Sequence, residues 1–162
     1  MKEIFEGLLV GNQSNYELCD FKENISFVLA AKEPWHRQAI GYTGRACDKA
    51  HPEYLIARRE NKLILNLVDA PKAEFFSKEI IDAALVFIQE ELELGRMVLV
   101  VCNEGRSRSA SIALLYLIKK GVIKGDTFED CEAEFLKLYP EYNPGEGIRG
   151  FCKLNWQSYI NQ

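Results

Sequence analysis

The residues best suited to do chemistry in this sequence lie in one short stretch, CNEGRSRS, which runs from Cys102 to Ser109. A cysteine is a nucleophile only as its thiolate, and the backbone N–H groups that can cradle a phosphate also stabilise a sulfur anion. Arg108 follows Cys102 by six positions, and its planar guanidinium matches two phosphoryl oxygens and keeps its charge. Ser109 can donate a hydrogen bond to the sulfur and help the thiolate leave in a second step. These residue types suit attack on a phosphate ester.

The segments on either side of this stretch are those that an anion site needs. Residues 97–101 are an apolar run rich in Val, which predicts a buried strand, and residues 109–118 predict a buried helix that ends near Gly121. A strand, a tight loop and a helix N-terminus turn several backbone N–H groups toward one point, and the helix dipole adds partial positive charge. Arg106 is expected to point outward and to widen the positive field at the pocket mouth. The residues expected to hold the phosphate are Asn103, Glu104, Gly105, Arg106, Ser107 and Arg108.

Strands and helices alternate along the rest of the chain, which predicts an α/β fold with helices on both faces of a sheet. A capping box is expected from Asp126 and Glu129, and a short helix is expected at HPEYLIARR with Pro52 at its first position. Ligands of such sheets bind at the carboxyl ends of strands, where both Cys102 and Asp69 are expected to lie. Further strands are expected at residues 7–11, 25–31 and 62–70, and helices at residues 77–94, 126–139 and 147–160.

Composition and charge favour one globular domain without membrane or nucleic-acid partners. The chain has 162 residues, of which 48% are hydrophobic, enough for one sizeable core. A formal net charge of −4 gives no global attraction to nucleic acid or to an anionic membrane. Five widely spaced cysteines, an odd number, indicate reduced thiols and a cytoplasmic location rather than disulfides or a zinc motif. The first residues lack a signal-peptide pattern, and the apolar runs are too short to span a bilayer.

The stretch VCNEGRSRS resembles the Cys-x5-Arg-Ser signature of the dual-specificity branch of the protein tyrosine phosphatases. Three further stretches, IFEGLLVGNQSNYEL, LNLVDAP and NPGEGIRGFCKLNWQSYI, resemble the opening strand, the general-acid strand end and the closing helix of that family. The likeness covers nearly the whole chain apart from about Lys32 to Asn61. It implies a single protein-tyrosine-phosphatase-like catalytic domain over residues 1–162, with a central, mostly parallel mixed sheet flanked by helices. It also implies hydrolysis of phosphorylated proteins or small phosphomonoesters through a cysteinyl-phosphate intermediate, without a metal or other cofactor.

Asp69 is the candidate general acid, 33 residues before the cysteine. The resemblance of LNLVDAP to the family's general-acid strand end favours this assignment over an ordinary turn residue. The leaving oxygen needs a proton as its bond to phosphorus breaks, and the same carboxylate can then activate the attacking water. Glu74 and Asp82 are the fallback acids, but their positions further along the chain make them less well placed.

The sequence departs from the family at Val101, where the family usually has a His directly before the nucleophile. That His is thought to order the loop and to help keep the thiolate, and Val can do neither by hydrogen bonding. Two alternatives therefore stay open: a weak or inactive phosphate-binding pseudophosphatase, and a phosphatase of a lipid, a nucleotide or an RNA 5′ end. Low-molecular-weight phosphatases and arsenate reductases fit less well because their loop lies near the N-terminus. Rhodanese-like phosphatases would not need Asp69 on an earlier strand.

The segment from Lys32 to Asn61 is mildly basic and is the part of the chain least like the family. We expect substrate choice to be made here, because the segment leads from one predicted strand to the strand that precedes Asp69. Its stretch WHRQAIGYTGR offers Arg37 and Arg45 as candidate anion-binding forks on the substrate rim. Trp35 and Tyr42 could add flat surfaces for a phenyl ring or a nucleobase.

Overall fold

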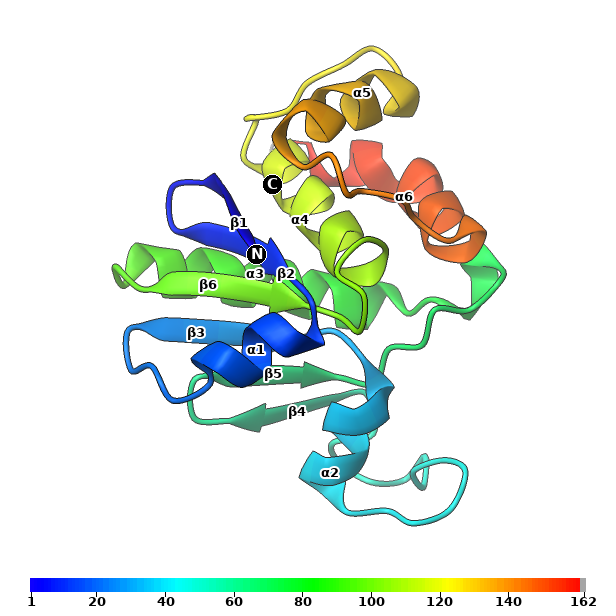
Figure 1. Ribbon diagram of the computed structural model, residues 1–162. Helices are drawn as coiled ribbons and strands as arrows, with labels where there is room; N and C mark the ends of the chain where they lie inside the picture. Colours follow the sequence, from blue (N-terminus) through cyan, green and yellow to red (C-terminus); the bar gives the residue numbers. More distant parts are fainter. Residues whose placement is uncertain (161–162) are drawn as a thin grey trace.

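The sheet at the centre of the protein is mixed, as the sequence predicts. Over residues 1–160, which the computed structural model describes, six strands follow the order β1-β2-β6-β3-β5-β4 (Figure 1). The inner pairs β2·β6, β6·β3 and β3·β5 are parallel, and the edge pairs β1·β2 and β4·β5 are antiparallel. The strands are β1 (Lys2–Phe5), β2 (Leu8–Gly11), β3 (Ile25–Leu29), β4 (Ile56–Arg59), β5 (Lys62–Leu65) and β6 (Met97–Val101).

Helices cover both faces of this sheet and make the protein a single-domain α/β fold (Figure 1). One face packs against α3 (Lys78–Glu93) and α4 (Arg108–Lys119), and α5 (Phe128–Leu138) and α6 (Glu146–Tyr159) pack against α4. The other face packs against α1 (Gln13–Cys19), the helical turn η1 (Lys32–His36) and α2 (Arg37–Ile40). A further short turn, η2 (Ala73–Phe75), precedes α3. No helix within residues 1–160 is long and apolar enough to cross a membrane.

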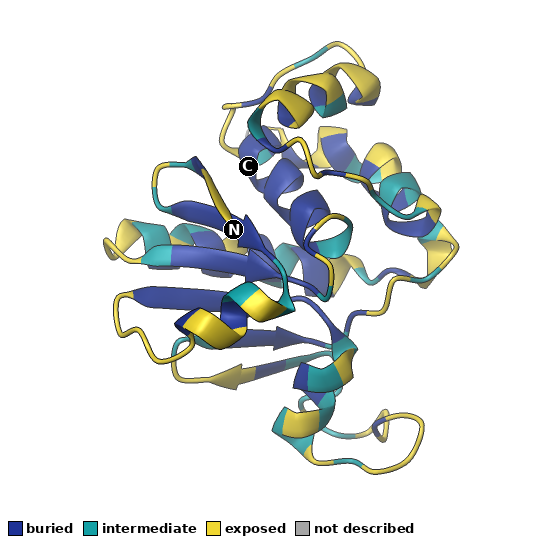
Figure 2. Ribbon diagram, in the orientation of Figure 1, coloured by how far each residue is buried: buried dark blue, intermediate teal, exposed yellow. Residues whose placement is uncertain are grey.

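Strand β6 places apolar side chains on both faces of the sheet. Val98 and Val100 belong to the larger apolar cluster under α3 and α4, and Leu99 and Val101 belong to the smaller cluster under α1 and η1. Because side chains alternate along a strand, a central strand covered on both sides must be apolar throughout. Figure 2 shows β6 and α4 buried along most of their length. The site-bearing strand and helix are thereby fixed in the densest part of the protein.

Two sequence-based expectations about elements are wrong. HPEYLIARR does not form a helix: its last four residues are strand β4, where Ala57 is buried and pairs with Ile64. Pairing with β5 supplies hydrogen bonds that override the local signal of Pro52. The strand expected at residues 62–70 ends at Leu65, because the backbone N–H and side-chain amide of Asn66 donate to the carbonyls of residues 55 and 54 (2.9 and 2.8 Å). Asp69 therefore lies in a loop beyond the strand.

The capping box of α5 also lies one residue later than expected. Its N-cap is Thr127, whose hydroxyl accepts from the N–H of Asp130 at 3.1 Å. The carboxylate of Asp130 accepts from the N–H of Thr127 at 3.2 Å, which completes the reciprocal pair in place of Asp126 and Glu129.

Candidate active site

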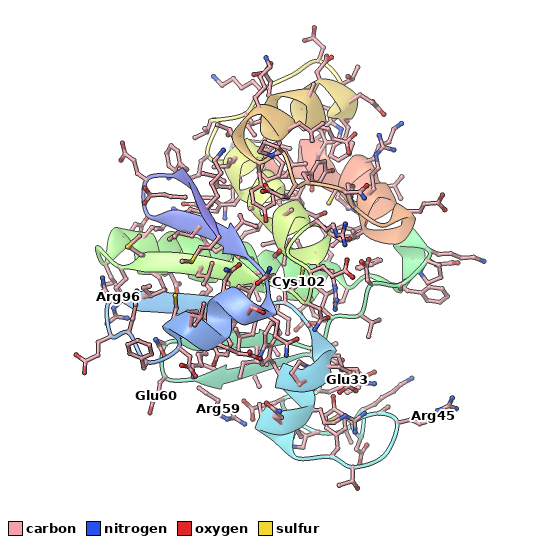
Figure 3. All side chains as sticks on the ribbon, viewed as in Figure 1. Glu33, Arg45, Arg59, Glu60, Arg96 and Cys102 are labelled. Carbon is pink, nitrogen blue, oxygen red and sulfur yellow. The ribbon has the colours of Figure 1, made fainter. Side chains whose placement is uncertain are left out.

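The loop between β6 and α4 forms the floor of a cavity of about 470 Å³. Cys102 follows the last residue of β6 and lies beside the first turn of α4 (Figure 3). The cavity thus opens at the carboxyl end of the central parallel strand and the N-terminus of a buried helix, as the sequence predicts. It is lined by Asp69, Cys102, Asn103, Glu104, Arg106, Ser107, Arg108, Asn143, Pro144 and Gly145.

The Cys102 thiol and the Ser109 hydroxyl lie next to each other. Cys102 is only 2% exposed, and its Sγ is 3.2 Å from Oγ of Ser109. Ser109 is fully buried, and its hydroxyl also lies 3.4 Å from the carbonyl oxygen of Gly11 on β2. The hydroxyl is thus in position to donate to a sulfur anion, which is the contact expected from the sequence.

The Arg108 guanidinium is held at two of its three nitrogens. Nη1 donates to the carbonyl oxygen of Leu67 at 2.9 Å, and Nη2 donates to Oδ1 of Asn103 at 2.6 Å. Among the described residues, Nε is buried and has no hydrogen-bond partner. Leaving a buried N–H unpaired is costly, so this nitrogen is ready for an acceptor.

Gly105 is required at the turn of the loop for two reasons. Its φ of +79° lies in the left-handed region, and a Cβ there would lie 2.9 Å from the carbonyl carbon and oxygen of Gly11. Its own carbonyl oxygen accepts from the Tyr139 hydroxyl at 2.6 Å. Burial raises the pKa of Tyr139 to about 12, so the hydroxyl keeps its proton at neutral pH and remains a donor. The loop is therefore anchored from β2 and from the end of α5.

Residues 143–145 form one wall of the cavity, and sequence reasoning missed them. The N–H of Asn143 donates to the carbonyl oxygen of Arg106 at 2.9 Å. The N–H of Gly145 donates to Oγ of Ser107 at 2.9 Å. Pro144 and Gly145 are turn residues between two predicted helices, and this was the only local signal for a loop at this position. The segment thus clamps the phosphate loop from the α5–α6 side.

Asp69 reaches the same cavity from the loop after β5. Its side chain is exposed and lies against Gly145, where an added Cβ would be 2.9 Å from Oδ1. Strand β3 separates β5 from β6, so Asp69 and Cys102 come from strands that are not neighbours in the sheet. The fallback acids Glu74 and Asp82 do not line the cavity, and Asp82 accepts from the Tyr159 hydroxyl at 2.6 Å.

Gly145→Ala is expected to slow turnover of a substrate with a poor leaving group by roughly tenfold, because the new methyl displaces the Asp69 carboxyl. The φ of Gly145 is −64°, which alanine adopts without strain, so the unfolding midpoint should change little. Steady-state hydrolysis of an alkyl phosphate measures the effect. Gly44→Ala is the matched control, since nothing lies within 4 Å of a Cβ there. Equal rates for Gly145→Ala and the wild type would mean that Asp69 does not act from this position.

Arg106 is exposed as expected, but its charge is partly offset. Its guanidinium pairs with the Glu104 carboxylate at 2.7 Å across the mouth of the cavity. The positive field at the mouth is therefore weaker than the sequence suggests.

Arg37 and Arg45 do not line the cavity, contrary to the expectation of a substrate rim. Arg37 donates to the Glu33 carboxylate and to the carbonyl oxygens of Tyr42 and Gly44, and it lies 4.8 Å from the centre of the Tyr42 ring. These contacts inside the segment occupy the guanidinium. Arg45 projects from the outer loop of the segment, away from Cys102 (Figure 3).

Trp35 is part of the apolar core. It is only 6% exposed and packs edge-on against Tyr16, which removes it as a surface for a substrate ring. His36 is fully buried, with its ring nitrogens 3.0 Å from the Tyr42 hydroxyl and 2.8 Å from the carbonyl oxygen of Glu53. Burial lowers the pKa of His36, which favours the neutral ring. The segment from Lys32 to Asn61 therefore has its own internal packing.

Val101 is fully buried in the smaller apolar cluster, on the face of the sheet opposite the larger cluster that contains Cys102. Its carbonyl oxygen accepts from the N–H of Ala30 at 2.8 Å. The side chain at this position packs beneath the loop and makes no polar contact with the thiol. Ordering of the loop must come from other residues.

This chain is similar to known proteins in both sequence and fold. No protein-family model matches it. The human dual specificity protein phosphatase 12 is 29% identical over 129 residues, which are 77% of this chain and 36% of that protein. The chain thus spans just over a third of the length of this curated relative.

Solved structures of other proteins share the fold of this chain. DUSP15 matches with a TM-score of 0.68 at 18% identity, covering 98% of this chain and 89% of that one. PTPMT1 in complex with PI(5)P matches with a TM-score of 0.63 at 19% identity, covering 97% and 94%. The chain is thus similar in sequence to dual-specificity phosphatases, and it shares the fold of DUSP15 and PTPMT1.

Among the five cysteines, Cys102 is the one that lines the cavity. Burial raises the pKa of the Cys131 and Cys152 thiols, so the thiolate form is disfavoured at both. Their surroundings are those of structural core cysteines. Only Cys102 combines a cavity wall, a helix N-terminus and an adjacent guanidinium.

Proposed function

We propose that this chain is a phosphomonoester hydrolase whose catalytic domain spans residues 1–162 and whose reaction passes through a phosphorylated Cys102. One observation carries the proposal: a single cavity is lined by the Cys102 thiol, the Asp69 carboxyl and Arg108, whose buried Nε lacks an acceptor. A phosphoryl group bound there would supply that acceptor and would meet the nucleophile and the acid together.

In the first step the Cys102 thiolate attacks phosphorus, and a P–S bond forms as the P–O bond to the leaving group breaks. The protonated Asp69 carboxyl gives its proton to the leaving oxygen. The N–H groups of residues 103–108 and the Arg108 side chain hold the three remaining oxygens. Because these donors are already placed, they stabilise the charge that develops in the transition state.

In the second step water attacks the phosphocysteine, and the Asp69 carboxylate takes the proton of that water. The P–S bond breaks, and inorganic phosphate and the Cys102 thiolate are formed. The Ser109 hydroxyl, 3.2 Å from the sulfur, donates to the departing anion. Neither step needs a metal ion or an organic cofactor.

Phosphorylated proteins and small phosphomonoesters are the proposed substrates. The name of dual specificity protein phosphatase 12 supports a protein substrate, and the PI(5)P bound to PTPMT1 makes a phosphorylated lipid the alternative. The second candidate function, a module that binds phosphate without turnover, rests on Val101, whose side chain gives the thiol no hydrogen bond.

Turnover of a substrate panel tests the proposal. Release of phosphate from 4-nitrophenyl phosphate, a phosphotyrosine peptide, a phosphothreonine peptide and a phosphoinositide would be measured alongside binding of inorganic phosphate. Turnover of any member supports the hydrolase. Phosphate binding without turnover would leave the binding module, and the lack of both would overturn the two candidates.

A further inference from the structure

The side chain of Asn103, directly after Cys102, makes three hydrogen bonds. Its Oδ1 accepts from Nη2 of Arg108 at 2.6 Å. Its Nδ2 donates to Oε1 of Gln13 at 3.1 Å and to the carbonyl oxygen of Glu33 at 3.0 Å. An amide has one oxygen and two N–H donors, and the partners here are one donor and two acceptors, so the orientation of the amide is set. Asn103 therefore connects Arg108 to α1 and to η1.

The second acceptor of Arg108, the carbonyl oxygen of Leu67, also contacts η1. Nη1 of Arg108 donates to the carbonyl oxygen of Leu67, and that oxygen also accepts from the backbone N–H of Lys32 at 2.8 Å. Lys32 and Glu33 thus contact both groups that hold the guanidinium. One contact runs through Leu67 and the other through Asn103.

Lys32 and Glu33 are themselves fixed by the rest of the Lys32–Asn61 segment. The Glu33 carboxylate receives two nitrogens of Arg37, and Arg37 also binds the carbonyl oxygens of Tyr42 and Gly44. Nζ of Lys32 donates to the carbonyl oxygen of Arg45 at 2.6 Å. These contacts fix the positions of Lys32 and Glu33 at the start of the segment. The segment reaches the cavity through backbone groups rather than through charged side chains on its rim.

We propose that Asn103 is a positioning residue that fixes the plane of the Arg108 guanidinium, and that Glu33 supports phosphate binding through Asn103 while Lys32 does so through Leu67. This inference rests on the proposed function of the cavity as a phosphoryl site. It also assigns the ordering of the loop to the hydrogen bonds of Asn103 rather than to the side chain of Val101. A charge-assisted hydrogen bond of this kind contributes enough to change oxyanion affinity by roughly tenfold or more.

A double-mutant cycle between Asn103→Ala and Arg108→Lys tests the inference. The measured quantity is the dissociation constant of inorganic phosphate, from its protection of Cys102 against iodoacetamide, so the cycle does not depend on turnover. In the wild-type background Asn103→Ala should raise this constant by roughly tenfold. In the Arg108→Lys background it should change it by less than about twofold, because lysine has no fork to position. The rate of Cys102 alkylation without phosphate is measured for each variant as the reference for protection, and the unfolding midpoint should stay near its wild-type value.

Gln13→Ala is the matched control, because it removes a contact of Asn103 while leaving Arg108 and Glu33 in place. It should change phosphate affinity by less than about threefold, since one neutral hydrogen bond is lost at a half-buried helix start. Equal effects of Asn103→Ala in both backgrounds would overturn the positioning role and leave the phosphoryl site standing. If wild-type protein does not bind phosphate, the proposed function fails and this inference fails with it.

Discussion

Cys102→Ser is expected to lower kcat on every phosphate ester by at least about a hundredfold while leaving phosphate binding in place. A serine hydroxyl at this position has no accessible anion, so the bond to phosphorus cannot form at neutral pH. The cradle that binds the oxyanion does not depend on the sulfur, because it consists of loop N–H groups and the Arg108 guanidinium held by Leu67 and Asn103. Steady-state rates and equilibrium phosphate binding would both be measured on the same preparation.

Cys47→Ser is the matched control for this experiment. Cys47 is buried in the Lys32–Asn61 segment, where its sulfur lies 3.6 Å from the carbonyl oxygen of Asp48, and a serine hydroxyl can make the same contact. This variant should turn over at close to the wild-type rate. Residual activity of Cys102→Ser above a hundredth of wild type would rule out the phosphocysteine. Loss of phosphate binding in Cys102→Ser would mean that the thiol shapes the cradle.

Asp69→Asn is expected to slow hydrolysis of an alkyl phosphate by roughly 10²–10⁴-fold and to slow 4-nitrophenyl phosphate much less. An alkoxide leaves only with a proton, whereas nitrophenolate leaves readily without one. Asparagine keeps the shape of the side chain against Gly145 and removes only the transferable proton. Single-turnover rates with the two substrates separate this first step from hydrolysis of the phosphocysteine.

Asp82→Asn and Glu74→Gln are the controls for Asp69, because they remove the two other acids that follow it in the chain. Neither residue lines the cavity, so neither variant should change the ratio of the two rates. Equal slowing of both substrates by Asp69→Asn would show that Asp69 is not the acid. A change in the ratio with Glu74→Gln would move the role to that residue, which requires the loop after β5 to rearrange.

The sequence was most informative where the site is continuous along the chain. A buried strand at residues 97–101 and an apolar helix after Arg108 are predicted with a loop between them, and the structure has this strand, loop and helix. Hydrogen bonds within the helix, burial of the strand and the positive φ of Gly105 act over a few residues, so their signals are local. The helix expected at residues 77–94 is found at Lys78–Glu93, and the mixed, mostly parallel sheet is the one that the family resemblance implies.

The sequence was least informative about which charged groups reach the cavity. Arg37 and Arg45 occur in one basic stretch of the sequence. The Arg37 guanidinium donates to the Glu33 carboxylate and to two carbonyl oxygens, and Arg45 projects away from Cys102 (Figure 3). The sequence shows only an arginine, whether its guanidinium binds a ligand or holds a turn together. Only its partners decide between these uses, and several of them are backbone oxygens that no residue type reveals.

The sequence by itself determined the candidate nucleophile Cys102, the Arg108 guanidinium and the strand and helix that present them, because neighbouring residues in one strand–loop–helix unit suffice to build that arrangement. Only the tertiary structure decided how the guanidinium is held and where the acid lies. The contacts that do so join Arg108 to Leu67, Asn103 to Glu33, and the Asp69 side chain to Gly145. Each depends on the packing of segments far apart in the chain. Such contacts are set by burial and by the satisfaction of backbone groups, which leave no repeating pattern in the sequence.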